Sequence, residues 1–374
     1  MAPVDTVVRK PKRHIDWPVL AVTGALMIIG LLTLYAAASE PLQEGLPRPV
    51  MMQAIFMGIG AVAMAVLAFV DSRVFERGAY LAYAAVLVML LLVLLVGPVR
   101  GGSQRWLPIG PFNLQPSELA KVVLVLACAR CFGANFRDDG WGIKQLLTPA
   151  ALFLAPLCTL TFLEPDLGTT LFLVFIFAGM TFVVGLRWRT LLALAVAGAL
   201  AAPVAYQYVL DDYQRERVDV LFAPDADPKG KGYQAIQGRW AIGSGRWTGK
   251  GWTQGTQGRL RFLPEQHTDF IFSVYAEERG FIGCLAALGL YFSLLMLGLL
   301  VAWNARDRFG SILAAGVVTI LLCQIGINLG GVLGLLPITG VTLPLMSYGG
   351  SSVITILIGI GMLLSVSMRR GPSH

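Results

Sequence analysis

The chain has 374 residues, of which 56% are hydrophobic and only 14% carry a formal charge, and its net charge is +7. Soluble domains average about a quarter charged residues, so this composition excludes an ordinary soluble protein and indicates one that spans a membrane. The positive balance comes from Lys and Arg in short loops between apolar segments. It is therefore no evidence for nucleic-acid binding, and we expect no nucleic-acid partner.

Apolar runs without charged residues recur along the chain, each near the roughly 20 residues needed to cross a bilayer. Seven single runs cover residues 17–38, 50–70, 78–99, 145–163, 167–186, 190–210 and 280–305. A longer run, 309–368, allows two crossings separated by the Gly- and Pro-rich stretch at 330–344, and residues 116–136 form a tenth, less apolar span. We therefore predict an all-α membrane protein of about ten transmembrane helices, in which residues 1–374 form a single domain.

The distribution of Lys and Arg predicts the orientation of these spans. Fifteen of these residues lie on the side of the N-terminus, whereas the short connections on the other side hold only Arg48, Arg100 and Arg105. Because positively charged loops stay cytoplasmic, both termini are predicted to be cytoplasmic. The polar segment 211–269, between spans seven and eight, is then a large extracytoplasmic loop. Within it, residues 233–243 have the pattern of an amphipathic helix that lies on the membrane surface.

Several kinds of chemistry are not indicated. The sequence contains no HExxH, P-loop or GxSxG motif, so zinc, nucleotide and serine-hydrolase sites are not predicted. Five cysteines, all in apolar spans, do not form a disulfide framework. The 22-residue run at 17–38 exceeds the roughly 7–15 residues of a signal-peptide core, so we interpret it as a retained first helix.

Two polar clusters lie near the start of the fourth predicted span. The motif RGGSQRWL contains Arg105 and Trp106, an adjacent pair typical of an interfacial anchor, although contact with a substrate stays open. In QPSELAK, Glu118 and Lys121 are three residues apart, so on a helix they share a face and can form an ion pair. Charges inside a membrane usually face a cavity, so a structural pair and a functional pair both remain open.

Two further clusters carry carboxylates at the mouths of later spans. EPDLGTT presents Glu164 and Asp166 at the tip of a hairpin, where a solvated turn is the ordinary interpretation. LPEQHTDFIFSVYAEERG places Asp269 beside His267 at the start of a span, and a carboxylate between water and hydrocarbon is costly and indicates a functional site. If the helix begins near His267, Glu277 lies two turns or more inside it. Carboxylates beside lipid suit an amphipathic substrate with a polar head and a lipid tail.

Seven motifs, in this order, resemble the SEDS family of bacterial peptidoglycan glycosyltransferases, and its RodA branch more closely than FtsW. They are RGGSQRWL, NLQPSELAK, EPDLGT, YQRERV, GKGWTQGTQ, FLPEQHTDFIF and PLMSYGGSS. The resemblance covers nearly the entire chain. One departure is AEERG at 276–280, where the family usually has a leucine before the glycine, and the charge that Arg279 adds there has no interpretation from the motif.

The resemblance implies that the protein polymerises lipid II into glycan strands on the outer face of the bacterial cytoplasmic membrane, during cell elongation and the maintenance of rod shape. In that reaction a sugar 4-hydroxyl attacks an anomeric carbon that carries an undecaprenyl-pyrophosphate leaving group. Asp269 matches the family's essential aspartate and is the candidate general base. The other candidate substrate-binding or cavity residues are Arg105, Trp106, Glu118, Lys121, Glu164, Asp166, His267 and Ser347.

Cofactors and partners follow from the same resemblance. Lys121, Arg105 or a divalent cation, Mg²⁺ or Mn²⁺, held by carboxylates would offset the pyrophosphate charge. The substrates are lipid II and the undecaprenyl-pyrophosphate-linked glycan. The protein partners are a class B penicillin-binding protein, which is a transpeptidase, and other elongation-machinery proteins. Two alternatives stay open, namely a lipid II flippase that makes no bond and a non-catalytic scaffold for a separate cell-wall synthase.

Overall fold

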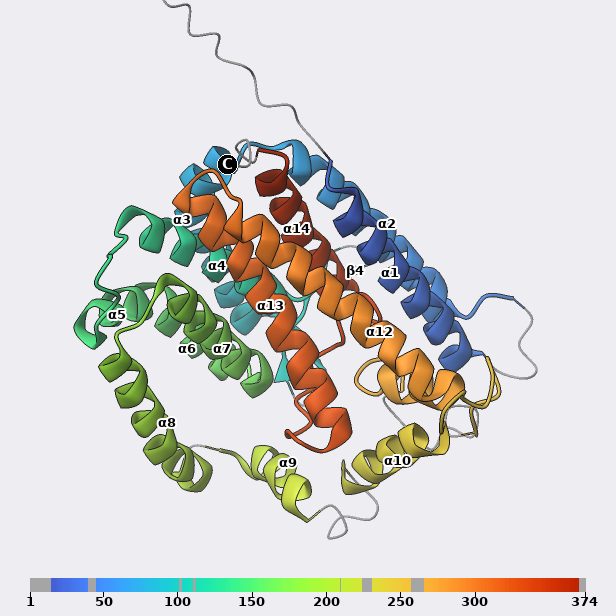
Figure 1. Cartoon of the computed structure of the whole chain (residues 1–374). Helices are drawn as coiled ribbons and strands as arrows, with labels where there is room; N and C mark the ends of the chain where they lie inside the picture. Colours follow the sequence, from blue (N-terminus) through green and yellow to red (C-terminus); the bar gives the residue numbers. More distant parts are fainter. Residues whose placement is uncertain are drawn as a thin grey trace, which may run out of the picture.

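The structure is a computed structural model that describes residues 15–39, 45–100, 103–109, 112–208, 210–223, 231–256 and 266–369. Most of these residues form long helices packed side by side (Figure 1). In the described part of the chain, nine helical segments are long and apolar enough to cross a membrane. The prediction of an all-α membrane protein is thereby confirmed.

These nine segments follow the predicted apolar runs closely. One of them, Ile143–Leu163, is continuous but contains a π-helical turn. The nine are α1 (Trp17–Ala38), α2 (Arg48–Phe69), α3 (Ser72–Val96), the series α5 (Ile143–Pro149), η1 (Ala150–Leu154) and α6 (Ala155–Leu163), α7 (Leu167–Val184), α8 (Trp188–Tyr208), α12 (Ile271–Trp303), α13 (Arg308–Leu333) and α14 (Gly350–Ser367).

The tenth predicted span forms α4 (Pro116–Ala134), which begins with proline at its first turn, where the missing N–H costs nothing. This helix is packed between α3, α7 and α13, so its charged residues lie inside the bundle. Burial is uneven across the fold, because 83% of the α14 span is buried but only 6% of the α8 span. Figure 1 accordingly shows α14 and α13 in the middle and α8 standing apart.

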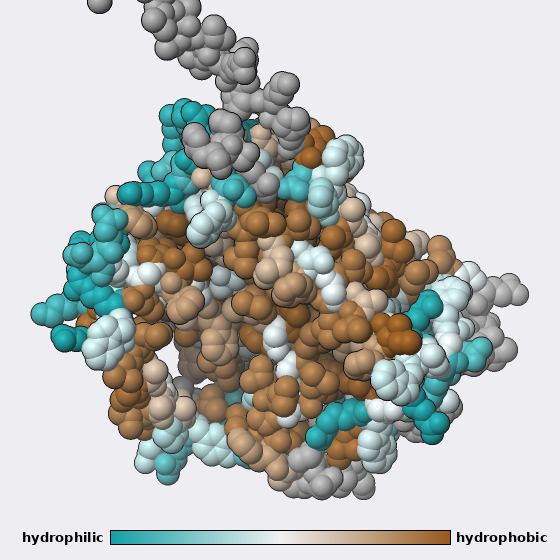
Figure 2. All heavy atoms as spheres, viewed as in Figure 1, coloured by the Kyte–Doolittle hydropathy of each residue, from teal (hydrophilic) through white to brown (hydrophobic). Residues whose placement is uncertain are grey.

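Glycine allows the central helix α14 to lie very close to α2. A Cβ on Gly60 would lie 2.5 Å from the Leu357 side chain, and one on Gly361 would lie 2.8 Å from the Met64 carbonyl oxygen. Small residues permit this approach, and in a membrane such close van der Waals packing is a main source of helix association. Figure 2 shows hydrophobic side chains covering the middle of one face, with hydrophilic side chains toward its edges.

The connection between α3 and α4 contains two short hairpins that the sequence analysis did not predict. Strand β1 (Val99–Arg100) pairs antiparallel with β2 (Ser103–Gln104), and β3 (Leu107–Ile109) pairs with β4 (Phe112–Leu114). They fold the connection back over the end of the bundle. Arg105 and Trp106 lie between the two hairpins and are placed there by them.

The described parts of the predicted large loop are mostly helical. They include α9 (Asp212–Phe222) and α10 (Lys231–Ser244), and α10 contains the expected amphipathic segment 233–243. Helix α10 packs against α12 and α13 (Figure 1). Residues 266–270 form turns and α12 begins at Ile271, so Glu277 lies less than two turns inside this helix, unlike in a helix that begins near His267.

Helix α12 is broken at Gly280, whose φ of 64° and ψ of −165° are non-helical. The break falls at the first residue of the charge-free run 280–305. Segment 246–251 fills the gap and satisfies the freed backbone groups. Its hydrogen bonds are Lys250 N to Glu277 O (3.0 Å), Gly251 N to Glu278 O (3.1 Å), Phe281 N to Arg246 O (2.7 Å) and Ile282 N to Trp247 O (3.1 Å).

Side chains reinforce this crossing. The buried carboxylate of Glu277 accepts hydrogen bonds from Lys250 Nζ at 2.6 Å and from the backbone N–H and hydroxyl of Thr256 at 2.9 Å each. Glu278 accepts one from the Thr253 N–H at 2.9 Å. Both acids therefore hold the loop against the helix, whereas Arg279 is exposed. The GKGW motif is thus a structural clamp on a broken helix.

Candidate functional site

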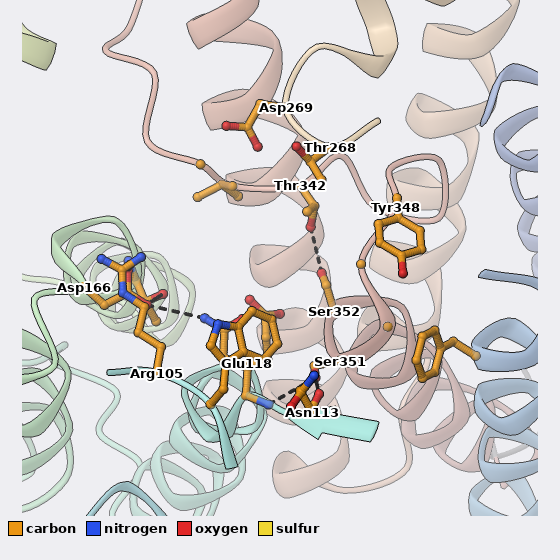
Figure 3. Close-up of a pocket in the computed structure, with 18 of the residues that line it drawn as sticks. Arg105, Asn113, Glu118, Asp166, Thr268, Asp269, Thr342, Tyr348, Ser351 and Ser352 are labelled. Atoms are coloured by element: carbon orange, nitrogen blue, oxygen red, sulfur yellow. Dashed lines mark hydrogen bonds and ion pairs between the residues drawn. The ribbon is translucent and has the colours of Figure 1, made fainter. Parts of the chain in front are cut away.

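A cavity of about 620 Å³ opens at one end of the bundle. The first turns of α2, α4, α7 and α14 reach it, as do the hairpin segment, α9 and the loops before α12 and α14. The structure brings six of the nine candidate residues together in its wall: Arg105, Trp106, Glu118, Lys121, Asp166 and Asp269. Figure 3 labels Arg105, Glu118, Asp166 and Asp269 among them. Glu164, His267 and Ser347 do not line the cavity.

The first charged group of the cavity is an ion pair on α4. Lys121 Nζ lies 2.7 Å from Glu118 Oε1, and both side chains are almost fully buried. The ammonium also lies 4.5 Å from the centre of the Phe172 ring, which favours a cation. In the described residues, Glu118 Oε2 is buried without a hydrogen-bond partner. One oxygen thus neutralises Lys121 while the other is a buried acceptor in a residue of the cavity wall.

A second pair joins the hairpin segment to the start of α7. Arg105 Nη1 lies 3.5 Å from Asp166 Oδ1, and Nη2 donates a hydrogen bond to the Pro165 carbonyl oxygen. Asp166 also caps α7, accepting hydrogen bonds from the Thr169 N–H at 3.3 Å and hydroxyl at 2.8 Å. A carboxylate at a helix N-terminus is stabilised by the unpaired N–H groups and by the helix dipole. Asp166 is thereby fixed, and it positions Arg105.

Glu164 is not in contact with solvent, although the sequence analysis took a solvated turn as the ordinary interpretation of its motif. Its side chain is fully buried between α6 and α7, and in the described residues neither carboxyl oxygen has a hydrogen-bond partner. Burial raises the pKa of Glu164 from 4.5 to about 8, the negative charge of Asp166 adds to the rise, and Arg105 opposes it. At neutral pH this residue is mainly a neutral acid beside the Arg105–Asp166 pair.

Asp269 occupies the opposite end of the cavity from Glu118 (Figure 3). It lies in the turn before α12, and its position is fixed through its backbone. The Asn328 side chain from α13 donates hydrogen bonds to the Asp269 carbonyl oxygen at 3.1 Å and to that of Val341 at 2.8 Å. Gly340, with φ +78°, passes close by, since a Cβ there would lie 3.8 Å from Asp269 Oδ2. The Asp269 carboxylate thus lies beside the loop that contains Gly340 and lines the cavity with it.

Ser347 and His267 connect the turn that carries Asp269 to the loop before α14. Ser347 Oγ donates to the Thr268 carbonyl oxygen at 2.6 Å and accepts from the Leu343 N–H at 2.8 Å. The Tyr348 N–H donates to the His267 carbonyl oxygen at 2.8 Å. These bonds tie the Asp269 turn to the loop before α14, so in the structure both residues have a positioning contact outside the cavity wall.

The sequence analysis missed several polar residues of the wall. Ser351 Oγ accepts from the Gln115 N–H at 3.1 Å, and the hydroxyls of Thr342 and Ser352 lie 2.9 Å apart. Gln115, Ser351 and Ser352 carried a sequence signal only as members of the QPSELAK and PLMSYGGSS motifs, and Thr342 belongs to neither motif. The other missed polar or charged wall residues are Arg48, Asn113, Thr169, Arg217, Thr268, Thr339 and Tyr348.

A metal site formed by protein ligands alone does not fit the described residues. No three His, Cys, Asp or Glu side chains converge there to hold an ion. Glu118 and Asp166 each face a cation of the protein instead. Mg²⁺ is commonly held by one or two carboxylates together with substrate phosphates. The divalent cation therefore stays a prediction, and no step below depends on it.

Comparisons with known proteins find similarity along almost the whole chain. A family model described as "Cell cycle protein", covering FtsW, RodA and SpoVE, matches residues 16–371. The chain is 37% identical to the peptidoglycan glycosyltransferase MrdB of Escherichia coli (strain K12), over 96% of this chain and 95% of that one. It is 34% identical to the stage V sporulation protein E of Bacillus subtilis (strain 168), over 94% and 96%.

Two solved structures are similar in fold and sequence. One belongs to a peptidoglycan synthase complex described as coordinating polymerization and crosslinking, with a TM-score of 0.80, 36% identity, and coverage of 96% of this chain and 99% of that one. The other is the rod shape determining protein RodA of Thermus thermophilus, with a TM-score of 0.70, 31% identity, and coverage of 96% and 98%.

Proposed function

The chain belongs to the cell cycle protein family of FtsW, RodA and SpoVE and is a peptidoglycan glycosyltransferase, and we propose that it polymerises lipid II with Asp269 as general base. The observation that carries the proposal is a single polar cavity with Asp269 at one end and two cations, each paired with a carboxylate, at the other. The sugar hydroxyl needs a base to accept its proton, and the departing pyrophosphate needs positive charge. In the proposal Asp269 supplies the base and the cations at the other end supply the charge.

The proposed reaction forms one glycosidic bond and breaks one bond to pyrophosphate. The 4-hydroxyl oxygen of an incoming lipid II attacks the anomeric carbon of the growing glycan, and the hydroxyl proton passes to the Asp269 carboxylate. The bond from that carbon to the pyrophosphate oxygen breaks, and its electron pair leaves with undecaprenyl pyrophosphate. Arg105 and Lys121 stabilise the departing charge, because cations fixed in advance cost no reorganisation during the reaction.

We infer further that the protein lies in the bacterial cytoplasmic membrane with the cavity facing outward. The support is the excess of Lys and Arg on the N-terminal side, fifteen against three. In a cysteine-free background, an impermeant thiol reagent added to intact cells should label a cysteine placed at position 225 but not one placed at the exposed Arg306. The reverse pattern would invert the orientation. Position 225 lies outside the described residues.

For the partner we propose a class B penicillin-binding protein, in line with the similarity to a peptidoglycan synthase complex. The run 309–368 is rich in small residues, which permit close helix approach and would suit such a partner. However, α14 is 83% buried and uses its glycines against α2, so little of that helix is open to a partner. The α12 span is only 33% buried and exposes large apolar side chains such as Phe281 and Phe292. We therefore propose that the partner's membrane helix contacts α12 and the exposed edge of α13.

The decisive experiment incubates the purified protein, with and without its partner, with labelled lipid II and analyses the product on a gel. Wild type should form polymer, with more formed when the partner is present. Asp269→Asn should form about 10²-fold less, the usual cost of losing a general base, while inserting into the membrane normally. The exposed Asp212→Asn is the matched control and should behave like wild type.

Each alternative predicts a different result. A flippase would move lipid II across vesicles without forming polymer and would not need Asp269 as a base. A scaffold would tolerate loss of every charged group in the cavity. Near-normal polymer from Asp269→Asn would remove this residue from the mechanism and reopen the flippase alternative. Equal activity with and without the partner would contradict the activation.

A further inference from the structure

Glu164 is the one fully buried charged residue in the turn between α6 and α7, and the mechanism above gives it no role. Buried polar atoms in proteins nearly always have hydrogen-bond partners, yet in the described residues both oxygens of this carboxyl lack one. A permanently ionised carboxylate without partners would be very costly at such a place. The residue needs a physical explanation, and its neighbours suggest one.

Two charged groups act on Glu164 electrostatically. Asp166 belongs to the same turn, and Arg105 reaches it from the connection between β2 and β3. Arg105 is tied to the turn by the 3.5 Å contact with Asp166 and by its hydrogen bond to the Pro165 carbonyl oxygen. It also lines the cavity, with 29% of its side chain exposed. One guanidinium therefore faces the turn on one side and the substrate cavity on the other.

The charge of Glu164 decides how strongly the turn holds that guanidinium. With Glu164 neutral, Arg105 faces one negative carboxylate and the local charge is balanced. With Glu164 ionised, the turn carries two negative charges against one positive charge. The second carboxylate attracts Arg105 toward the turn and repels an anion in the cavity. The two protonation states thus differ in how well this end of the cavity receives phosphate.

We propose that Glu164 is a positioning residue that, while neutral, leaves Arg105 available to a pyrophosphate group of a lipid-linked substrate in the cavity. The proposal rests on the proposed polymerase function for the identity of the substrate. Glu164 does not touch the substrate, since it does not line the cavity. It acts through Arg105, and its ionisation weakens substrate binding.

The test follows the KM for lipid II as the pH rises through the pKa of Glu164, which burial raises to about 8. We expect the KM of wild type to increase about tenfold between about pH 7 and about pH 9, because one added negative charge acts near the phosphates in a poorly solvated site. In Glu164→Gln, an uncharged isostere, the increase should be less than about twofold over the same range. The matched control is Glu76→Gln, on a residue that does not line the cavity, which should keep the full wild-type increase.

A second measurement separates this proposal from the polymerase proposal itself. The Kd of lipid II is measured in the Asp269→Asn background with and without Glu164→Gln, so that no polymer needs to form. The pH dependence of Kd should be present with Glu164 and absent with Gln. A protonated-carboxyl infrared band at neutral pH that disappears in Glu164→Gln would report the proton directly. Equal pH dependence of KM and Kd in the paired proteins, or a missing infrared band, would overturn the role of Glu164 even if polymerisation is confirmed.

Discussion

The two ends of the cavity hold their charges in different ways. At the α4 and α7 end, two positive charges contact negative side chains: Lys121 contacts Glu118 at 2.7 Å and Arg105 contacts Asp166 at 3.5 Å. At the other end, Asp269 is fixed through its backbone by Asn328. Figure 3 shows the two groups separated across the cavity.

This difference suits the two kinds of substrate group. An ion pair keeps the net charge of this end near zero while no phosphate is bound, and its cation can attract a phosphate when substrate enters. A base must instead be held in one place, because misplacing a reacting group by about 1 Å can cost a hundredfold in rate. We therefore expect substitutions at the α4 and α7 end to change the charge balance of the cavity, and substitutions around Asp269 to change the position of the base.

The largest effect should follow from splitting the buried pair on α4. Glu118→Gln and Lys121→Met each leave one uncompensated buried charge, which costs about 3–5 kcal/mol of stability. Each should lower lipid II polymerisation by at least about 10²-fold, because it also unbalances the cavity. The double variant should unfold at a higher temperature than either single one, since it leaves no unpaired charge. The exposed Lys144→Met is the control, and normal expression with full activity of both single variants would refute the coupling.

A smaller effect is expected at the other end from Asn328→Ala. This change removes the hydrogen bonds to the carbonyl oxygens of Asp269 and Val341, so the turn that carries the base loses its support from α13. We expect kcat to fall about tenfold, with little change in KM. Asn304→Ala is the matched control, because Asn304 makes only a local bond to the Leu300 carbonyl oxygen at 2.9 Å on the surface. A KM effect without a kcat effect would contradict a positioning role.

Most of the fold was predictable, because a bilayer requires long apolar runs and charged residues mark their ends. The first predicted span, 17–38, coincides with α1. The break at Gly280 was not visible, since AEERG continues a helical pattern and only the contact with segment 246–251 stabilises the interruption. The two hairpins were missed because their strands have only two or three residues each.

The site was predictable where a costly charge marked it. Asp269, Glu118 and Lys121 stood out because charges are expensive near hydrocarbon, and the structure places them in one cavity. Thr342 and Ser352 are ordinary polar residues, and only the fold brings their hydroxyls within 2.9 Å. The burial of Glu164 depends likewise on how α6 and α7 pack, so a turn motif alone could not reveal it.

Helix α12 follows the turn that carries Asp269, and the rigidity of the clamp that segment 246–251 forms on this helix can be tested. A Cβ at Gly280 would lie 2.3 Å from the Gly249 nitrogen, and the φ of +64° is itself unfavourable for other residues. Gly280→Ala should therefore cost about 1–3 kcal/mol of stability and lower the unfolding temperature in detergent. Gly289→Ala is the matched control in the same helix, since a Cβ there meets nothing within 4 Å. Equal unfolding temperatures for the two variants would show that the crossing is not rigid.

The last test concerns the pH dependence of stability contributed by Glu164. Burial raises the pKa of this carboxyl from 4.5 to about 8 in the folded protein, so between those values the folded state binds a proton that the unfolded state has lost. The stabilisation is complete below about pH 4.5, declines as the pH rises, and is lost above about pH 8. Wild type should therefore unfold at progressively lower temperature from about pH 5 to about pH 8, and Glu164→Gln should show a shallower decline, because the amide does not titrate. Glu76→Gln should keep the wild-type slope. If all three slopes agree, Glu164 is ionised in the folded protein, and the charged end of the cavity holds one more negative charge than the comparison assumes.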